Sequence, residues 1–272
     1  MKIPFTKMHG LGNDFIVIDG RREDPGDLPA LARRLCDRRF GIGADQVLLL
    51  YDSKVSDFRM RIFNADGGEV EMCGNGIRCL AKYIWDRGIS HSTVLSVETL
   101  AGIMRPEKAG DLITVDMGEP VLEGRRIPVD RDGIIKDLPL EIGGREFTIT
   151  CVSMGNPHAV TVVDDLDGVD VKKYGPLIET HALFPRRTNV EFIQVTDSAH
   201  IRMRVWERGS GETMACGTGA SAAAVAAHMK GLAEKKVKVA LLGGELMIEW
   251  KDDNHVYMTG PAVEVFEGRV TI

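Results

Sequence analysis

Hydrophobic side chains recur along this chain with two different spacings. Residues 28–36 carry apolar side chains at helical spacing, which predicts an amphipathic helix. A longer apolar run at residues 77–85 predicts a second helix. Short apolar runs bounded by glycine and polar residues predict strands at residues 5–8, 15–18, 47–50 and 59–64. Many short strands with few helices indicate a mixed α/β or α+β fold.

The second half of the chain repeats this order of elements. Strands are predicted at residues 149–154, 159–163, 190–195 and 201–207, followed by a helix at residues 220–229. Only small side chains occur at residues 217–224, which indicates a helix closely surrounded by strands. Further strands are predicted after each helix, at residues 93–99, 101–106 and 111–117, and at residues 236–242, 245–250 and 255–259.

A short motif occurs twice, as Cys-Gly-Asn-Gly at residues 73–76 and as Cys-Gly-Thr-Gly at residues 216–219. The same interval of 143 positions, from residue 73 to residue 216, relates Arg-Met-Arg-Ile-Phe at 59–63 to Arg-Met-Arg-Val-Trp at 202–206. A constant interval over so much of the chain indicates one structural unit used twice.

The two halves also end in similar segments, Met-Gly-Glu-Pro at 117–120 and Met-Thr-Gly-Pro at 258–261. Because the chain enters the second half after the first of these segments, symmetry predicts that residues 263–272 return to the first half. We therefore expect two pseudo-symmetric domains, 1–118 plus 263–272 and 119–262, with the C-terminal strand completing the first domain.

Composition narrows the class of protein. Of the 272 residues, 44% are hydrophobic and 27% are charged, which is typical of a globular domain. A net charge of −6 gives no electrostatic reason to expect nucleic acid or a membrane as partner. No apolar run approaches the roughly 20 residues that span a bilayer, and no signal core opens the chain, so we expect a cytoplasmic protein. Five irregularly spaced cysteines make a poor disulfide framework, so we expect reduced thiols.

The repeated motif places a cysteine where a strand and a glycine turn lead into a helix. Unpaired backbone N–H groups and the helix dipole favour negative charge there, so we expect a lowered thiol pKa. The same N–H groups can hold a substrate carboxylate, which glycine allows to approach closely. If Cys73 and Cys216 face one carbon, one thiolate can remove a proton while the other thiol delivers one to the opposite face. The result is inversion of a stereocentre.

The sequence also bears on other interpretations of these cysteines. Either could be a small buried residue that serves packing, but a motif preceded by Gly-Glu in both halves favours function. A zinc site would need four ligands at characteristic spacings, a redox pair a Cys-x-x-Cys motif, and a nucleotide site a longer glycine pattern. These patterns are missing, so we expect no metal site, no redox pair and no nucleotide-binding loop. Cys36, Cys79 and Cys151 are interpreted as core residues.

Five motifs together resemble the diaminopimelate epimerase family: HGLGNDF at 9–15, GIGADQ at 41–46, RIFNADGGEVEMCGNGIRC at 61–79, GNPH at 155–158 and ERGSGETMACGTGA at 207–220. The resemblance covers most of the chain. It implies an isomerase that interconverts LL- and meso-2,6-diaminopimelate for lysine and peptidoglycan biosynthesis without pyridoxal phosphate or another cofactor. It also implies a homodimer of two-domain subunits. Each domain would be a curled, mainly antiparallel sheet or barrel around a central helix, with the active site in the cleft between the domains.

The resemblance implies roles for individual residues. Cys73 and Cys216 would be the acid and base, and His158 and Glu207 would lie beside the reacting centre. Gly74, Asn75, Gly217 and Thr218 would hold the reacting carboxylate through backbone N–H groups. The side chains implied to line the substrate site or hold the distal end of the substrate are Asn13, Gln46, Asn64, Asn156, Asn189, Glu207 and Arg208.

Some polar positions break the repeat: His158 corresponds to Phe15, and Glu207 to Asn64. A substrate with one inverting and one fixed centre would require such asymmetry, and Arg208 can bind a distal carboxylate with two hydrogen bonds. Other interpretations remain open at this point. Arg208 could form a surface ion pair, His158 could be a core histidine, and Asn13 and Asn156 could be turn residues.

Two alternative functions remain open. Proline and hydroxyproline racemases also pair two cysteines. Their substrate is a ring without a distal charged group, so such an enzyme would not need polar residues such as Asn64, Asn189 and Arg208 to bind one. A noncatalytic amino-acid-binding protein could retain the same cradle. Exchange of the substrate α-hydrogen with solvent deuterium would distinguish an epimerase from a binding protein.

Overall fold

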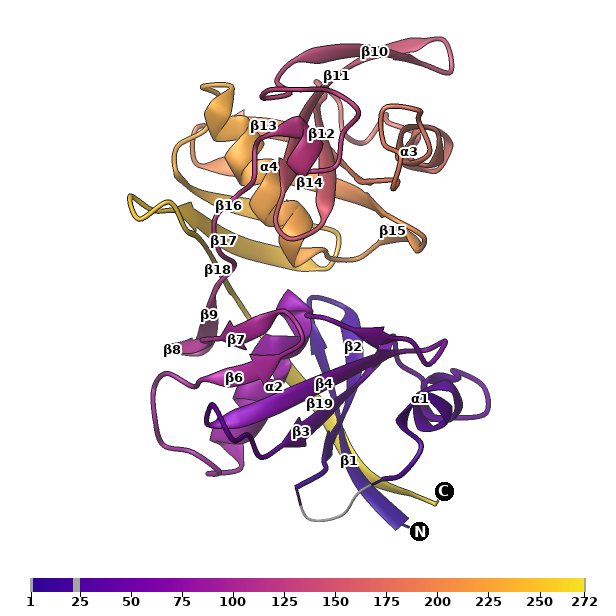
Figure 1. The fold of residues 1–272 in the computed structure, drawn as a ribbon, viewed down its shortest axis with the longest axis vertical. Coiled ribbons are helices and arrows are strands. Elements are labelled where there is room, and N and C mark those ends of the chain that lie inside the picture. The colour runs from indigo at the N-terminus through magenta and orange to yellow at the C-terminus, as the bar shows by residue number, and fades with distance from the viewer. Residues whose placement is uncertain (1, 22–24, 272) are drawn as a thin grey trace. The chain divides into compact units, whose positions relative to one another are not determined.

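The structure is a computed structural model that describes residues 2–21 and 25–271 (Figure 1). The chain divides into two compact units, Met1–Val115 with Thr259–Ile272, and Asp116–Met258. These limits lie a few residues from the domain assignment based on the repeat, 1–118 plus 263–272 and 119–262.

The first unit is built on a mixed, mainly antiparallel sheet with the strand order β19-β1-β2-β3-β4-β6-β7, in which β5 also pairs with β4. The pairs β2–β3 and β4–β6 are parallel, whereas β1–β2, β3–β4 and β6–β7 are antiparallel. The strands are β1 (Lys2–Gly10), β2 (Asn13–Asp19), β3 (Gln46–Tyr51), β4 (Phe58–Asn64), β5 (Glu69–Val70), β6 (Val97–Thr99), β7 (Gly102–Met104) and β19 (Val263–Thr271), with a further hairpin of β8 (Glu107–Ala109) and β9 (Leu112–Asp116).

Two helices of the first unit pack on opposite faces of this sheet. The helix α1 (Leu28–Cys36) shares a core cluster with Leu49 of β3, whereas α2 (Gly74–Asp86) approaches the neighbouring residue Leu48 at Gly76. Successive strand residues point to opposite faces, so this alternation places the helices on either side. The start of α1 is set by Asp27, whose side chain accepts a hydrogen bond from the N–H of Ala30. The predicted helix at residues 28–36 is confirmed.

The C-terminal strand belongs to the first unit. β19 pairs antiparallel with β1, from Lys2 opposite Thr271 to His9 opposite Val263. The chain leaves the first unit before residue 116. Val121 then lies in the second unit, where it forms an antiparallel bridge with Ser153. The return of the C-terminal segment to the first half, predicted from symmetry for residues 263–272, is therefore confirmed for residues 263–271, and residue 272 lies outside the described residues.

The second unit has a larger sheet with the order β10-β11-β12-β13-β14-β16-β17-β18, in which β15 also pairs with β14. Its β12–β13 pairing is parallel in the register of β2–β3, since His158 lies opposite Asn189 as Phe15 lies opposite Gln46. The strands are β10 (Leu138–Ile142), β11 (Arg145–Ser153), β12 (Pro157–Val162), β13 (Asn189–Asp197), β14 (His200–Glu207), β15 (Gly211–Thr213), β16 (Lys236–Leu241), β17 (Gly244–Trp250) and β18 (Val256–Gly260).

The helix α4 (Gly217–Met229) is the centre of the second unit. It contacts β11, β12, β13, β14, β16 and β17, and its residues 219–227 are buried on every side. The prediction of a helix closely surrounded by strands is confirmed. The helix α3 (Val171–Glu179) and the short 3-10 helix η1 (Gly124–Arg126) were not predicted.

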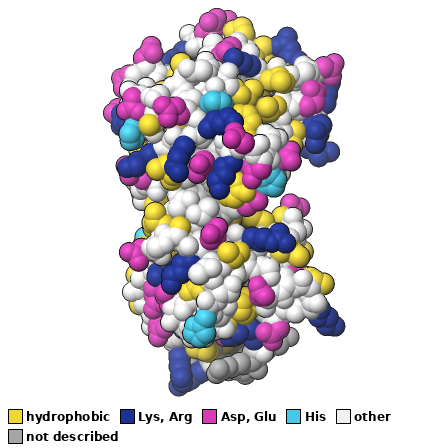
Figure 2. Space-filling view, turned by 90° about the vertical axis from the view of Figure 1, so that its left-hand side faces the viewer, with side chains coloured by type: hydrophobic (Ala, Val, Ile, Leu, Met, Phe, Trp, Pro, Cys, Tyr) yellow, Lys and Arg dark blue, Asp and Glu magenta, His cyan; other side chains and the backbone are white. Residues whose placement is uncertain are grey.

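The sheets are curled but open. In the described residues the strand order of each sheet has two ends, so the alternative of a closed barrel is wrong. On the face shown in Figure 2, acidic and basic side chains are interspersed, in keeping with the small net charge of −6. None of the helices in the described ranges is both long and apolar enough to cross a bilayer.

Candidate active site

The two cysteines of the repeated motif hold equivalent positions in their units. Cys73 is the N-cap of α2 and Cys216 the N-cap of α4, with backbone angles of φ −139°, ψ 118° and φ −130°, ψ 113°. Each sulfur accepts a hydrogen bond of 3.4 Å from a backbone N–H, that of Gly76 in the first unit and that of Gly219 in the second. The sequence motif therefore builds the same helix N-terminus twice, with a sulfur atom at its positive end.

Asn13 lies beside Cys73. The thiol can donate to Asn13 Oδ1 at 3.7 Å, and Asn75 Nδ2 donates to the same oxygen at 3.2 Å. On its other side, Asn13 Nδ2 donates to Asp45 Oδ2 at 2.8 Å. Three predicted site residues thus come together at one helix N-terminus, and Asp45, which was not predicted, fixes the orientation of the Asn13 amide.

Asp45 belongs to a charged network behind Asn13. Arg38 bridges the carboxylates of Asp14 and Asp45 at 2.7 and 2.8 Å, and Lys7 Nζ lies 2.6 Å from Asp14 Oδ2. Burial alone would raise the pKa of Asp14, but hydrogen bonds from Arg38 and Lys7 outweigh it and lower that pKa to about 2. Asp14 is therefore ionised at neutral pH, and the network supports the loop that carries Asn13.

This network predicts an acid-dependent contribution to stability. Because the pKa of Asp14 in the folded protein is depressed from 3.8 to about 2, its contribution is fully present above pH 3.8 and is lost as the pH falls toward about 2. Asp14→Asn should therefore lower the free energy of unfolding at neutral pH. The difference from the unmodified protein should shrink over that acid range, as measured by urea unfolding at a series of pH values. A difference that stays constant from pH 7 to pH 2 would contradict this account.

Gln46 and Asn64 form a second polar cluster of the first unit. They lie opposite each other on β3 and β4, and Gln46 Nε2 donates to Asn64 Oδ1 at 2.8 Å. Gln46 Oε1 is shielded from solvent and accepts no hydrogen bond within the described part of the chain. A buried acceptor of this kind is costly to leave unpaired, so it is suited to a donor group of a ligand.

Cys216 differs from Cys73 in its surroundings. It is only 5% exposed, and burial, followed by the charges of Glu207 and Glu191, raises its pKa well above the ordinary value. Hydrogen bonds from Thr218 and the N–H of Gly219 act in the opposite direction but do not prevail. The lowered thiol pKa expected from the helix N-terminus alone is therefore wrong for Cys216, because desolvation and two carboxylates outweigh the helix dipole.

Glu207 lies beside this thiol at the end of β14. Burial raises its pKa, while hydrogen bonds with Thr213 and Cys216 oppose the shift. Its carboxylate therefore lies between the Cys216 thiol and the hydroxyl of Thr213, the last residue of β15.

His158 is fully buried on β12. Its Nδ1 lies 2.7 Å from Glu191 Oε1, and its Nε2 lies 2.9 Å from Asn156 Oδ1. Both ring nitrogens are thus engaged within the unit, which matches the interpretation of a satisfied core histidine as well as a role beside the reacting centre. Glu191 was not predicted. The signal was available, because the repeat places a leucine, Leu48, at the equivalent position.

The side chain of Asn189 binds the backbone of Arg208. Asn189 Oδ1 accepts from the N–H of Arg208 at 2.9 Å, and its Nδ2 donates to the carbonyl of Pro157 at 2.8 Å. The buried carboxylate of Glu179 accepts from the next N–H, that of Gly209, at 3.1 Å. The loop that carries Arg208 is therefore held from two sides, and its guanidinium donates to the carbonyl of Arg186 at 3.2 Å.

The predicted residues are divided between the units. The first unit contains Asn13, Gln46, Asn64, Cys73, Gly74 and Asn75, and the second contains Asn156, His158, Asn189, Glu207, Arg208, Cys216, Gly217 and Thr218. In each unit a part of the set surrounds the helix N-terminus with the cysteine.

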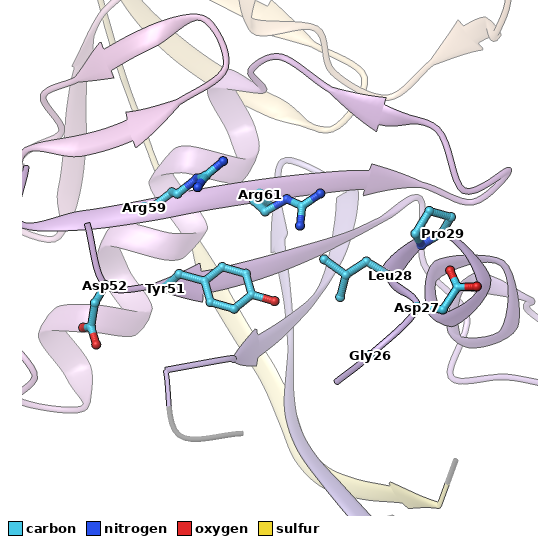
Figure 3. A pocket seen from close by; sticks show the side chains of 8 residues that line it. All are labelled: Gly26, Asp27, Leu28, Pro29, Tyr51, Asp52, Arg59 and Arg61. Carbon is cyan, nitrogen blue, oxygen red and sulfur yellow. The ribbon is translucent and has the colours of Figure 1, made fainter. Parts of the chain in front are cut away.

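A pocket of about 550 Å³ lies elsewhere in the first unit. Figure 3 shows Tyr51, Arg59 and Arg61 along β3 and β4, and Asp27 at the start of α1. Arg61 is engaged by Glu69 through two hydrogen bonds of 2.7 and 2.9 Å. None of the predicted site residues lines this pocket, so it is distinct from the cysteine site. The full lining is Gly26, Asp27, Leu28, Pro29, Tyr51, Asp52, Arg59 and Arg61.

Comparison with known proteins agrees with the motifs. The profile of the family described as diaminopimelate epimerase matches residues 5–123 and 150–265. The diaminopimelate epimerase of Moorella thermoacetica is 57% identical over 272 residues, covering 97% of this chain and 98% of that protein. The one of Acetivibrio thermocellus is 53% identical over 275 residues, covering 98% of each.

Among solved structures, a phenazine biosynthesis protein of the PhzF family from Bacillus anthracis has a TM-score of 0.73 at 19% identity, with 100% of both chains covered. A likeness at that identity shows the shared two-domain fold alone. The sequence matches extend through both halves and include both cysteine motifs. By these matches, the chain belongs to the diaminopimelate epimerase family.

Proposed function

We propose that this protein is an isomerase that converts LL-2,6-diaminopimelate to meso-diaminopimelate, a step that serves lysine and peptidoglycan biosynthesis. The observation that carries the proposal is the pair of N-cap cysteines, which have nearly the same backbone geometry in two copies of one unit. Full-length similarity to diaminopimelate epimerases supports the choice of substrate.

In the proposed reaction, Cys73 and Cys216 act on opposite faces of one α-carbon. The sulfur that is a thiolate takes the α-proton, and the electron pair left on carbon spreads onto the carboxylate. The other thiol then delivers its proton to the opposite face, so that one proton is taken up and one is released. The reverse reaction exchanges the two roles, as a quasi-symmetric pair permits. No redox step or cofactor enters this balance.

The helix N-termini support the charge that develops on the substrate. Gly74 and Asn75 open α2, and Gly217 and Thr218 open α4. In the proposed complex their backbone N–H groups bind the reacting carboxylate. Glu207, hydrogen-bonded to Cys216, is placed to receive or return the thiol proton. His158 engages Asn156 through Nε2.

The remaining residues are proposed to bind the rest of the substrate. Asn13 and Gln46 line the site from the first unit, and Gln46 Oε1 supplies a buried acceptor suited to an ammonium group. Asn64, Asn156, Asn189 and Arg208 hold the distal amino acid end. The loop held by Asn189 supports a fixed orientation of Arg208. We further propose a cytoplasmic homodimer that acts without a metal, nucleic acid or membrane partner.

Solvent isotope exchange tests this function. Incubation of the purified protein with LL-diaminopimelate in D₂O should yield meso product with a single deuterium at the inverted α-carbon, because the delivered proton comes from a thiol in exchange with solvent. Mass spectrometry and chiral separation measure label and configuration together. Conversion without label would exclude the two-thiol reaction. Binding without conversion would indicate a noncatalytic binding protein, and turnover of proline instead would indicate a proline racemase.

A further inference from the structure

The two cysteine sites differ at one pair of positions beneath them. The repeat relates Phe15 and Leu48 of the first unit to His158 and Glu191 of the second. The strand registers are equivalent, since Val17 lies opposite Leu48 as Val160 lies opposite Glu191. An apolar pair and a polar pair therefore occupy the same place in the two units.

In each unit this place lies against the first turn of the cysteine-bearing helix. In the first unit, a Cβ placed on Gly76 would lie 3.2 Å from Leu48 Cδ2 and 3.5 Å from Phe15 Cε1. In the second unit, a Cβ placed on Gly219 would lie 2.8 Å from Glu191 Oε1 and 3.3 Å from Cys216 Sγ. The Glu191 carboxylate thus lies directly against the turn that begins at Cys216, where Leu48 presents a methyl group beneath Cys73.

The polar pair is fully buried. Glu191 Oε1 lies 2.7 Å from His158 Nδ1, and His158 Nε2 faces Asn156 Oδ1 at 2.9 Å. Both ring nitrogens of His158 therefore face oxygen atoms, and the contact with Nδ1 fixes the position of the Glu191 carboxylate. Glu191 Oε2 receives no hydrogen bond from the described residues. A buried ion pair rarely stabilises a fold more than apolar residues of similar size, and the first unit shows that an apolar pair fits here.

We propose that Glu191 is a positioning residue that keeps Cys216 in its thiol form in the free enzyme, by placing a carboxylate against the positive end of α4. The N-terminus of a helix carries about half a positive charge, which favours a thiolate at its N-cap. Glu191 cancels this effect at Cys216, whereas the uncharged Leu48 occupies the equivalent position in the first unit. The proposed two-thiol reaction needs one thiol and one thiolate. Glu191 would make the two sulfur atoms differ in protonation state before substrate binds. The inference rests on the proposed function in that respect.

Other groups around Cys216 come from the strands packed against α4. Glu207 on β14 adds a second carboxylate, and the Thr218 hydroxyl lies 3.5 Å from the sulfur. Cys151 on β11 stays neutral because burial raises its pKa to about 12. The strands β16 and β17 contribute buried aliphatic side chains. Burial is the largest cause of the raised pKa of Cys216, with Glu207 and Glu191 next, which agrees with the geometry.

The test is an NMR titration of the unliganded protein labelled with [3-¹³C]cysteine, whose Cβ shift reports thiol and thiolate. The Cys216 signal is assigned by its loss in Cys216→Ala. In Glu191→Gln, which keeps the shape of the side chain and removes its charge, the Cys216 midpoint should fall by about one to three pH units. Glu179→Gln, which neutralises another buried carboxylate of the same unit, is the matched control and should leave the midpoint unchanged.

A second variant allows the Cys216 midpoint to be measured if Glu191→Gln does not fold. The double substitution His158→Phe with Glu191→Leu reproduces the apolar pair of the first unit and should also lower the midpoint. An unchanged midpoint in either folded variant would overturn the proposal. Loss of the folded state in both would overturn it too, because the pair would then be required by the fold itself. The titration uses no substrate, so its failure is distinguishable from a failure of the isotope experiment.

Discussion

Replacing either Cys73 or Cys216 with alanine is expected to lower kcat for diaminopimelate epimerisation by about 10²–10⁴-fold, the usual contribution of one general acid or base. Both losses should be of this size, because inversion needs a group on each face of the carbon. Chiral separation of LL- and meso-diaminopimelate measures the rate. The value of KM should change much less, since the backbone N–H groups of both helix N-termini remain in place in either variant.

The matched control is Cys36→Ala. Cys36 is also a buried thiol, and burial raises its pKa to about 12, but it lies in the α1 core of the first unit. Its loss should reduce stability through a small cavity and leave kcat within a few-fold of the unmodified enzyme. If Cys73→Ala or Cys216→Ala retained more than a tenth of the activity while folded, the two-thiol reaction would be wrong.

Elements with strong local signals could be predicted from the sequence. The helices α1, α2 and α4 follow from apolar spacing and from the glycine turns that precede two of them. The helix α3 was missed because Gly175 and Pro176 interrupt its apolar pattern. The repeat contained the missing information: the interval of 143 carries Leu28–Cys36 onto Val171–Glu179, the bounds of α3.

The sequence predicts those features of the site that depend on residues close together in the chain. A cysteine at a helix N-cap follows from strand, turn and helix in sequence, and both N-caps are where the motif places them. The pKa of Cys216 does not follow, because it depends on burial and on Glu191 from another strand. Asp45 and Glu179 were missed for the same reason, since each acts through hydrogen bonds to residues about thirty positions away.

The glycine in α3 compensates for a larger neighbour on β14. The interval of 143 relates Ala32 and Phe63 of the first unit to Gly175 and Trp206 of the second. A Cβ on Gly175 would lie 2.6 Å from Trp206 Cγ and 2.7 Å from Trp206 Cβ, closer than side-chain atoms pack. The wider indole has therefore been accommodated by removing a methyl group from the helix.

Gly175→Ala is accordingly expected to destabilise the protein. Alanine in place of glycine within a helix usually stabilises by about 0.5–1 kcal/mol, but overpacking costs about 1–3 kcal/mol, so the net effect should be unfavourable. Trp206→Phe alone should also destabilise, because it removes the 2.7 Å hydrogen bond from Nε1 to Glu179, worth about 1 kcal/mol. The double variant restores the alanine–phenylalanine pair of the first unit and should lose less stability than the sum of the single changes. Guanidinium unfolding measures this cycle, and strictly additive losses would show that Gly175 does not compensate for Trp206.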